Sequence, residues 1–334
     1  MSELAVAMFA AETGAHLLVA PASRRYEAFA RSFDEADCRR QLAGRGIRWV
    51  ARRDDGYPAR LRSIHDPPIG LFIRGAASLE LLDRPSVAIV GARACSPYGS
   101  EVGTTFARRL AGAGVVVVSG LARGVDAAAH RGALAAGVTV AVLGCGIDHD
   151  YPIAHASLAA EIEANGLIVS EYPPGVEPAP WRFPARNRIV AGLADATVVV
   201  EARARSGALI TADFALEEGR EVLAVPGEIT SHLSAGSNAL LRLGATPATD
   251  ASDVLEAIGI ESATAVVSEG RPADLSATAE AVKTLVADAP VGVDEIVRRT
   301  GLGASEVSAA LVELELHALV TEAEGVYRGV MRPA

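Results

Sequence analysis

The residues best suited to chemistry in this chain are arginines and aromatic side chains that lie close together. In WRFPARNR, residues 181–188, three arginines alternate with Trp181, Phe183 and Asn187. Guanidinium groups neutralise phosphates and aromatic rings stack on bases, which are the two requirements of a groove for single-stranded nucleic acid. The alternative interpretation is an arginine-rich surface loop whose aromatic side chains pack into the hydrophobic core. The segments before and after this one favour the groove.

Glycine turns follow several apolar runs. Gly91 and Arg93 lie in VAIVGARACSPYG, and VVVVSGLARGVDAAAHRGAL contains Ser119, Gly120 and Arg123. A strand, a glycine turn and a helix together present backbone N–H groups to an anion. We therefore expect phosphate contacts at both turns.

Two later turns have the same character, because Ser and Gly precede a helical segment in RSGALITADF and a Gly-Ser-Asn turn opens GSNALLRLGA. Small polar residues at a helix start leave backbone N–H groups accessible. The predicted DNA or phosphate-binding residues are Gly91, Arg93, Ser119, Gly120, Arg123, Phe183, Arg186, Asn187, Arg188, Ser206, Gly207, Ser237 and Asn238.

The same turns do not fit other chemistries. They lack the G-x-G-x-x-G spacing and the acidic residue of a nicotinamide site. Cys145 has His149 as a possible base, but no signature of a cysteine nucleophile surrounds it, so a packing role is expected. His149, Asp150 and His155 lie in a loop without the spacing of metal ligands. We expect no catalytic residue, no metal and no cofactor.

Alternating strand and helix patterns position these turns. The apolar runs fall at 87–90, 115–118, 139–143, 167–170, 197–200 and 221–225. Continuous apolar strands separated by helical segments predict an α/β fold with an extended Rossmann-like, doubly wound and mostly parallel sheet. Ligands of such sheets bind at the carboxyl ends of the strands, where the turns above lie.

The pattern also divides the chain. Residues 1–75 read as a small helical segment and a lead-in, 76–260 as the Rossmann-like domain, 261–277 as a linker and 278–334 as a winged helix. The third helix expected in the winged helix carries three glutamates and no Lys or Arg. Major-groove reading is therefore not expected of this domain, and a protein contact or a regulatory role is.

Composition limits the classes further. The net charge is −10, and residues 76–260 hold 13 Arg against 20 acidic residues, so only locally gathered arginines could hold a phosphate. Three cysteines, an odd number far apart, do not indicate a disulfide framework. The first 20 residues lack the basic leader and apolar run of a signal peptide, and no later run has the length of a membrane span. A soluble, cytoplasmic protein is expected.

Together these blocks resemble the DNA-processing protein A (DprA/Smf) family of bacteria. The resemblance runs from DDGYPARLRSIHDPPIGLFIRG through FPARNRIVAGLADATVVVEARARSGALITADF to GSNALLRLGA, about residues 46–258, and resumes in LVELELHALV. It implies a non-catalytic protein that binds and protects single-stranded DNA and helps load a RecA-type recombinase during natural transformation. It also implies a homodimer formed through the Rossmann-like domain.

Two other functions remain open at this stage. One is a nucleoside monophosphate phosphoribohydrolase, whose P-G-G-x-G-T-x-x-E turn is missing here, although Glu201 and Glu217 are carboxylates in the comparable region. The other is an adaptor that binds a small nucleotide and contacts a partner through the acidic winged helix. The arginine and aromatic segment is larger than a mononucleotide requires, which favours a strand of DNA.

Overall fold

The computed structural model describes residues 2–13, 24–261, 275–288, 290–317, 319–323 and 325–329. Contacts divide the chain into two units, Met1–Ser262 and Ala263–Ala334. Most of the segment expected to be a linker lies outside the described residues. Within the described residues, no helix has the length and apolar character needed to cross a membrane.

The first unit is built on a nine-stranded sheet in the order β1-β2-β6-β5-β4-β3-β7-β8-β9. The strands are β1 (Arg48–Ala51), β2 (Gly70–Arg74), β3 (Ser86–Val90), β4 (Val116–Ser119), β5 (Thr139–Val142), β6 (Leu167–Ser170), β7 (Ala196–Val199), β8 (Glu221–Ala224) and β9 (Thr246–Pro247). From β6 to β9 all neighbours are parallel, whereas β2 pairs antiparallel with β6 and with β1. The expected mostly parallel, doubly wound sheet is confirmed.

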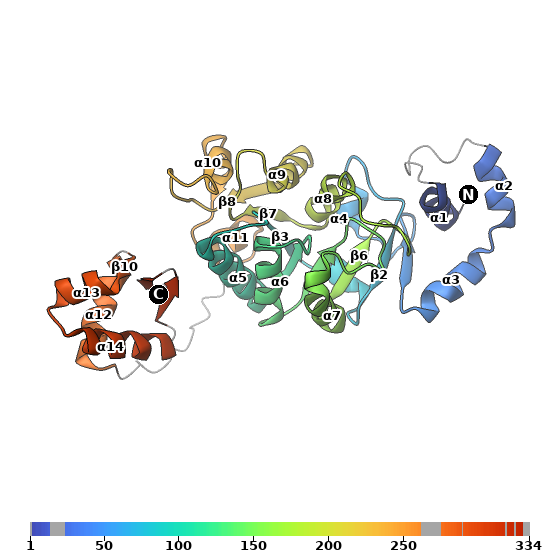
Figure 1. Cartoon of the computed structure of the whole chain (residues 1–334). Helices are drawn as coiled ribbons and strands as arrows, with labels where there is room; N and C mark the ends of the chain where they lie inside the picture. The colour runs from blue at the N-terminus through green and yellow to red at the C-terminus, as the bar shows by residue number, and fades with distance from the viewer. Residues whose placement is uncertain are drawn as a thin grey trace. The chain divides into compact units, whose positions relative to one another are not determined.

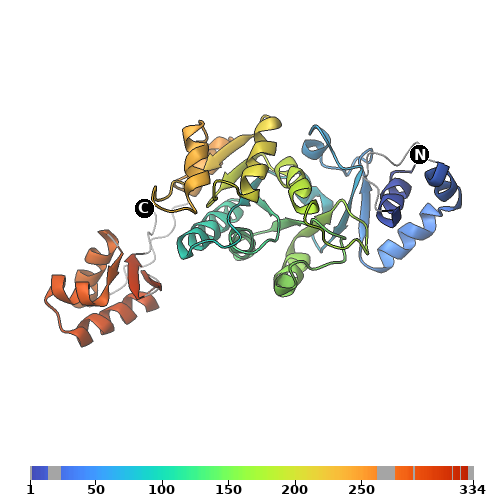
Figure 2. The same ribbon diagram turned by 45° about the horizontal axis from the view of Figure 1, so that its top comes forward.

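Helices cover both faces of this sheet (Figure 1). One face is covered by α5 (Pro97–Gly112), α6 (Val125–Leu134), α7 (Ala156–Asn165) and α11 (Ala251–Ala257). The other is covered by α4 (Ala59–Arg62), α8 (Arg182–Leu193), α9 (Gly207–Glu217) and α10 (Ala235–Arg242). The N-terminal helices α1 (Glu3–Thr13), α2 (Arg24–Ser32) and α3 (Glu35–Gly44) lie at the β1 end of the same unit (Figure 2).

The central strands are apolar throughout because both of their faces are buried. In β3, Val87 and Ile89 pack into the cluster beneath α5 and α6, whereas Ala88 and Val90 pack into the cluster beneath α8 and α9. Successive side chains of a strand point to opposite faces, so a two-sided core needs apolar residues at every position. This explains the continuous runs seen in the sequence.

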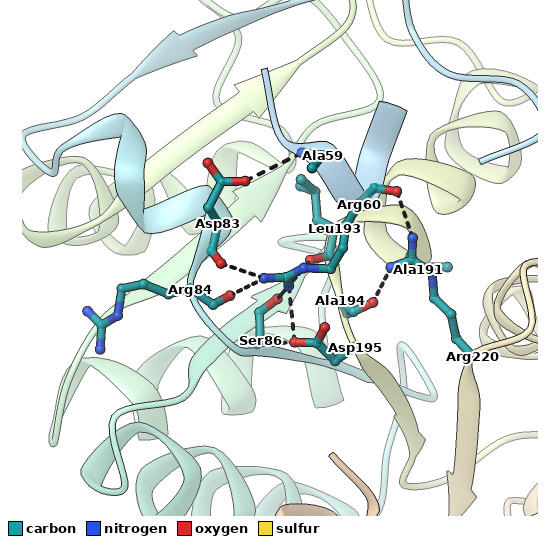
Figure 3. Close-up of polar contacts among 10 residues, drawn as sticks. All are labelled: Ala59, Arg60, Asp83, Arg84, Ser86, Ala191, Leu193, Ala194, Asp195 and Arg220. Carbon is teal, nitrogen blue, oxygen red and sulfur yellow. Dashed lines mark hydrogen bonds and ion pairs between the residues drawn. The ribbon is translucent and has the colours of Figure 1, made fainter. Parts of the chain in front are cut away.

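The sequence places a domain boundary at residue 75, but strands β1 and β2 of the lead-in belong to the same sheet as the Rossmann-like core. Figure 3 shows how the lead-in is fastened at the amino end of that sheet. The guanidinium of Arg60 donates to Ser86 Oγ (2.5 Å) and to the carbonyl of Leu193 (3.0 Å) and forms an ion pair with Asp195 (3.1 Å). Arg220 donates to the Arg60 carbonyl at 2.8 Å.

Arg60→Ala is expected to destabilise the first unit by about 2–3 kcal/mol. The substitution removes the hydrogen bonds from the guanidinium to Ser86 Oγ and to the carbonyls of Asp83, Arg84 and Leu193, and a typical hydrogen bond contributes about 0.5–1.5 kcal/mol. Urea unfolding of the full chain measures the loss. Arg25→Ala, on the exposed surface of α2, is the matched control and should stay within about 0.5 kcal/mol of the wild type.

A buried histidine makes the stability of the first unit depend on pH. His130 of α6 is fully buried, and its Nδ1 lies 2.7 Å from Thr139 Oγ1. The Thr139 hydroxyl already donates to the Val117 carbonyl, so the imidazole donates through Nδ1. Burial, and to a smaller extent the charge of Arg186, lowers the pKa of His130 to about 3, so the ring is neutral at neutral pH.

The free energy of unfolding is therefore expected to fall as the pH drops from about 6.5 towards 3. In that window the unfolded state binds a proton that the folded state refuses, which costs about 1.4 kcal/mol per pH unit. Guanidinium unfolding of the wild type and of His130→Gln between pH 7.5 and 4.5 isolates this contribution from the carboxylates. A stability difference between the two proteins that does not change with pH would refute it.

The second unit has the expected order of a winged helix. Its elements are α12 (Ala277–Asp288), β10 (Val291–Gly292), α13 (Val293–Thr300), α14 (Ala304–Leu316), β11 (Val320–Ala323) and β12 (Val326–Gly329). The three strands form a sheet in the order β10-β12-β11, and Val282, Ile296, Leu311 and Leu314 belong to its own apolar core. A separate core means that this unit is stabilised by its own packing.

Candidate single-strand binding edge

The strand order gathers four exposed arginines at the carboxyl edge of the sheet. Strands β4, β3 and β7 are neighbours in the sheet. The loop after β4 carries Arg123, the loop after β3 carries Arg93, and the loop after β7 carries Arg203 and Arg205. All four side chains are exposed, and within the described residues none of them forms an ion pair. We call these four residues the arginine edge. Arg203 and Arg205 were not predicted, although EARARSG directly follows the β7 run.

Two aromatic rings lie beside the arginine edge. Phe183, in the first turn of α8, stacks on Tyr151 with the ring centroids 5.2 Å apart and the planes inclined by 24°. The Arg93 guanidinium lies 5.6 Å above the Phe183 ring. Tyr151 is 45 % exposed and was also missed in the sequence, where it stands among residues that resemble a loop cap. Arginine beside half-exposed rings is the arrangement that phosphates and bases require together.

The glycines at these turns permit close packing of the loops on the core. A Cβ atom on Gly91 would lie 2.6 Å from Val125 Cγ2, and one on Gly120 would lie 2.6 Å from Arg186 Nη2. Gly124, with φ of 75°, has the left-handed conformation that only glycine adopts without strain. Because these glycines have no side chain, the backbone of the two turns packs closely against the core and the start of α6. Arg93 and Arg123 of the same turns remain at the surface.

The structure places Arg186 and Arg188 beneath the surface and not on it, which differs from the expectation. Arg186 is 4 % exposed and donates to the carbonyls of Gly120 (2.8 Å) and Val142. Arg188 donates to both carboxylate oxygens of Glu171, at 2.9 and 2.7 Å, and forms an ion pair with Asp66. The donors of both side chains are thus turned towards protein acceptors.

Asp126 is the buried counterpart of Arg186. Its carboxylate accepts from the N–H groups of Gly120 (3.2 Å) and Ala122 (3.3 Å). Burial raises the pKa of the Asp126 carboxyl above its usual value, and the nearby Arg186 guanidinium opposes that rise. These contacts hold the 120–124 turn from below, so Arg186 positions the loop that carries Arg123.

The remaining predicted residues hold the loops of the same edge. Ser119 is fully buried and donates to the Ile89 carbonyl at 2.7 Å. Asn187 donates to the Gly207 carbonyl at 3.0 Å, which ties α8 to the start of α9. Ser206 caps α9 by accepting from the Ala208 N–H, and the neighbouring Gly207 is exposed. Of these residues, only Gly207 has an open surface.

The last predicted pair lies after β8. Ser237 is fully buried and donates to the Ser234 carbonyl at 3.2 Å. The Asn238 amide donates to the Gly227 carbonyl (2.9 Å) and accepts from the Gly227 N–H (3.2 Å). Two such bonds fix a loop as a backbone pair would, so Ser237 and Asn238 shape the 225–234 loop at the edge.

The carboxylate and the thiol considered for catalysis have other partners. Glu201 is 3 % exposed and accepts from the Ser96 N–H (2.9 Å) and hydroxyl (2.6 Å), which fixes the loop after β3. Cys145 is buried, and burial raises the pKa of its thiol to about 11. Such a thiol is protonated at neutral pH and is a poor nucleophile. The described residues contain no group of His, Cys, Asp and Glu that could hold a metal ion.

The fold and this edge define a class: a Rossmann-like protein that presents arginines and aromatic rings at its strand ends and carries a winged-helix unit. The family model described as DNA recombination-mediator protein A matches residues 48–259, and the DprA winged helix domain model matches residues 267–325. The chain therefore belongs to the DNA recombination-mediator protein A family, and the resemblance seen in the sequence is confirmed.

Known relatives agree with this assignment. A putative DNA processing protein DprA of Mycobacterium tuberculosis is 41 % identical over 310 residues, which cover 88 % of this chain and 79 % of the relative. The solved DNA processing protein A of Streptococcus pneumoniae is 39 % identical with a TM-score of 0.64 over 76 % of this chain and 91 % of that one. The Helicobacter pylori protein, solved for its single-stranded DNA binding mode, is 33 % identical with a TM-score of 0.57 over 63 % and 94 %.

Proposed function

We propose that this protein binds single-stranded DNA along the arginine edge and acts as a recombination mediator in natural transformation. The observation that carries the proposal is the set of four exposed arginines on three neighbouring strand ends beside the Phe183 and Tyr151 rings. Phosphates would lie against the arginines and one or two bases against the rings. A mononucleotide would occupy only part of this surface.

The binding needs little sequence information, because phosphate contacts and stacking read no base edges. We propose that the chain has no catalytic activity on DNA, since the Glu201 carboxylate, which follows the same strand as Arg203, is occupied as a loop acceptor. Binding a strand without cutting it suits a protein that protects incoming DNA and helps load a RecA-type recombinase. Such work places the protein in the cytoplasm.

We also propose a homodimer formed through the Rossmann-like unit. The edge strand β9 has only one neighbour in its sheet, and Leu243, which follows α10 beside it, is 85 % exposed. An unpaired strand edge with an exposed leucine suits a contact with a second copy. The winged helix is proposed to contact a protein or to have a regulatory role and not to bind DNA, because the exposed Glu306 and Glu315 of α14 would repel a DNA backbone.

The affinity for single-stranded DNA is expected to fall steeply with salt. Four phosphate contacts predict a slope of log K against log salt of about −3, equivalent to a loss of about 50-fold between 50 and 200 mM. Fluorescence anisotropy of labelled 20-mer oligothymidylate across a salt series measures the slope. Absence of binding at low salt by folded protein, or mononucleotides competing as well as oligonucleotides, would favour a nucleotide-sensing adaptor instead.

A further inference from the structure

A cavity of about 270 Å³ lies beside the first turns of α8, and Phe183 is not part of its lining. Its walls come from Ala7 and Ala10 of α1, from Pro68 and Ile69 before β2, and from Val176 and Trp181. The surface is mainly apolar, and Trp181 is 52 % exposed. A space of this size suits a single flat heterocycle and is smaller than a typical drug-sized site. We call it the α1–α8 cavity.

An aromatic and cationic stack forms one side of this cavity. The Arg182 guanidinium lies between two rings, 4.9 Å from the Trp181 ring and 5.1 Å from the Tyr172 ring. Its Nε is buried and has no hydrogen-bond partner in the structure. Trp181 and Arg182 immediately precede Phe183, so the start of α8 contributes to both the stack and the aromatic pair, whereas Tyr172 and Tyr151 come from other loops.

Carboxylates form a polar end of the same cavity. Glu171 is 3 % exposed, and both of its oxygens accept from Arg188. Asp66 pairs with Arg188 through Oδ2, no other described residue pairs with its second oxygen, and its side chain is 44 % exposed. The second oxygen of Asp66 is therefore available to accept a hydrogen bond from an occupant. A carboxylate accepts from an amino group and repels a carbonyl oxygen.

We propose that the α1–α8 cavity takes one unstacked base of a bound single strand and prefers bases that carry an exocyclic amino group. The inference rests on the proposed function and adds a base preference to it. Cytosine offers its N4 amino group to Asp66, whereas thymine presents O4 at the same place. Because Arg182 of the lining is the residue before Phe183, a strand that crosses the arginine edge would pass close to the cavity.

The test compares labelled 20-mers of dC and dT in anisotropy titrations of the full chain at one salt concentration. We expect dC to bind about 3–10-fold more tightly than dT, which is the size of one hydrogen bond of typical net strength. Asp66→Asn should abolish the preference for dC, because the amide no longer repels O4 of thymine and can donate to it, so that dC weakens and dT binds as well as before or more tightly. Asp213→Asn, an exposed carboxylate on α9 outside the lining, removes the same charge and should leave both affinities unchanged.

A second measurement needs no change at Asp66. The chain has two tryptophans, of which Trp49 is 8 % exposed, so stacking of a base on Trp181 should quench the emission and Trp181→Ala should abolish that quenching. Trp181→Ala should also weaken dC binding by about fivefold or more.

Three outcomes would overturn the inference. Equal affinities for dC and dT in the wild type, or emission unchanged at saturating DNA, would remove the cavity from the binding path while leaving the proposed function intact. A wild type that binds neither oligomer would refute the proposed function and this inference with it.

Discussion

Reversing two charges of the arginine edge, in Arg93→Glu with Arg123→Glu, should lower the affinity for single-stranded DNA by about 100-fold or more at 100 mM salt. Both guanidinium groups are exposed, and within the described residues neither is bound to a carboxylate. The substitutions remove two phosphate contacts and set two like charges against the backbone, a penalty of about 3 kcal/mol. The slope of affinity against salt should become shallower by about 1.4, because two contacts are lost.

The matched control is Arg108→Glu with Arg131→Glu. These arginines are also exposed, and they lie towards the C-terminal ends of α5 and α6, away from the carboxyl edge of the sheet. The net charge changes by the same amount, so a loss caused by overall charge would appear in both proteins. Thermal unfolding should be unchanged in both. An equal loss of affinity in the control would mean that DNA is not held at the arginine edge.

The central sheet could be predicted from the sequence because every strand of its core is buried on both faces. Runs such as residues 87–90 and 115–118 are apolar throughout, and the glycine turns mark where each ends. The position of β1 and β2 in the sheet could not be predicted in this way. They pair antiparallel, and antiparallel strands need no crossover helix, so the sequence carries no alternating pattern that assigns them to this sheet. Their place depends on contacts with β6, about 95 residues later.

The sequence predicted which kinds of residue form the site, but it did not predict which of the arginines are buried. In α8, Arg186 occupies the same helical stripe as Ile189, Val190 and Leu193, all of which are buried. The helical spacing of these residues therefore predicts that position 186 is buried, whereas the charged side chain of an arginine predicts that it is exposed. The carbonyls of Gly120 and Val142 and the nearby Asp126 carboxyl, which come from distant segments, make burial of the charge tolerable. No local pattern contains that information.

Arg186→Met is accordingly expected to act on stability before it acts on DNA. Removing the buried guanidinium removes its hydrogen bonds to the Gly120 and Val142 carbonyls, and hydrogen bonds to charged groups contribute about 1.5–3 kcal/mol each. The loop that carries Arg123 should then lose its support, and DNA affinity should fall as a consequence. Urea unfolding and anisotropy on the same samples give both quantities, with Arg108→Met as the exposed control.

The double variant Arg186→Met with Asp126→Asn separates support from direct contact. If Arg186 acts through its electrostatic interaction with Asp126, Asp126→Asn removes the carboxyl that Arg186 offsets, while the asparagine oxygen can still accept from the Gly120 and Ala122 N–H groups. The double variant should then be more stable than the sum of the two single losses by about 1–3 kcal/mol, the coupling typical of residues in one network. Stability unchanged in Arg186→Met, with DNA affinity lost, would instead place this guanidinium on the DNA.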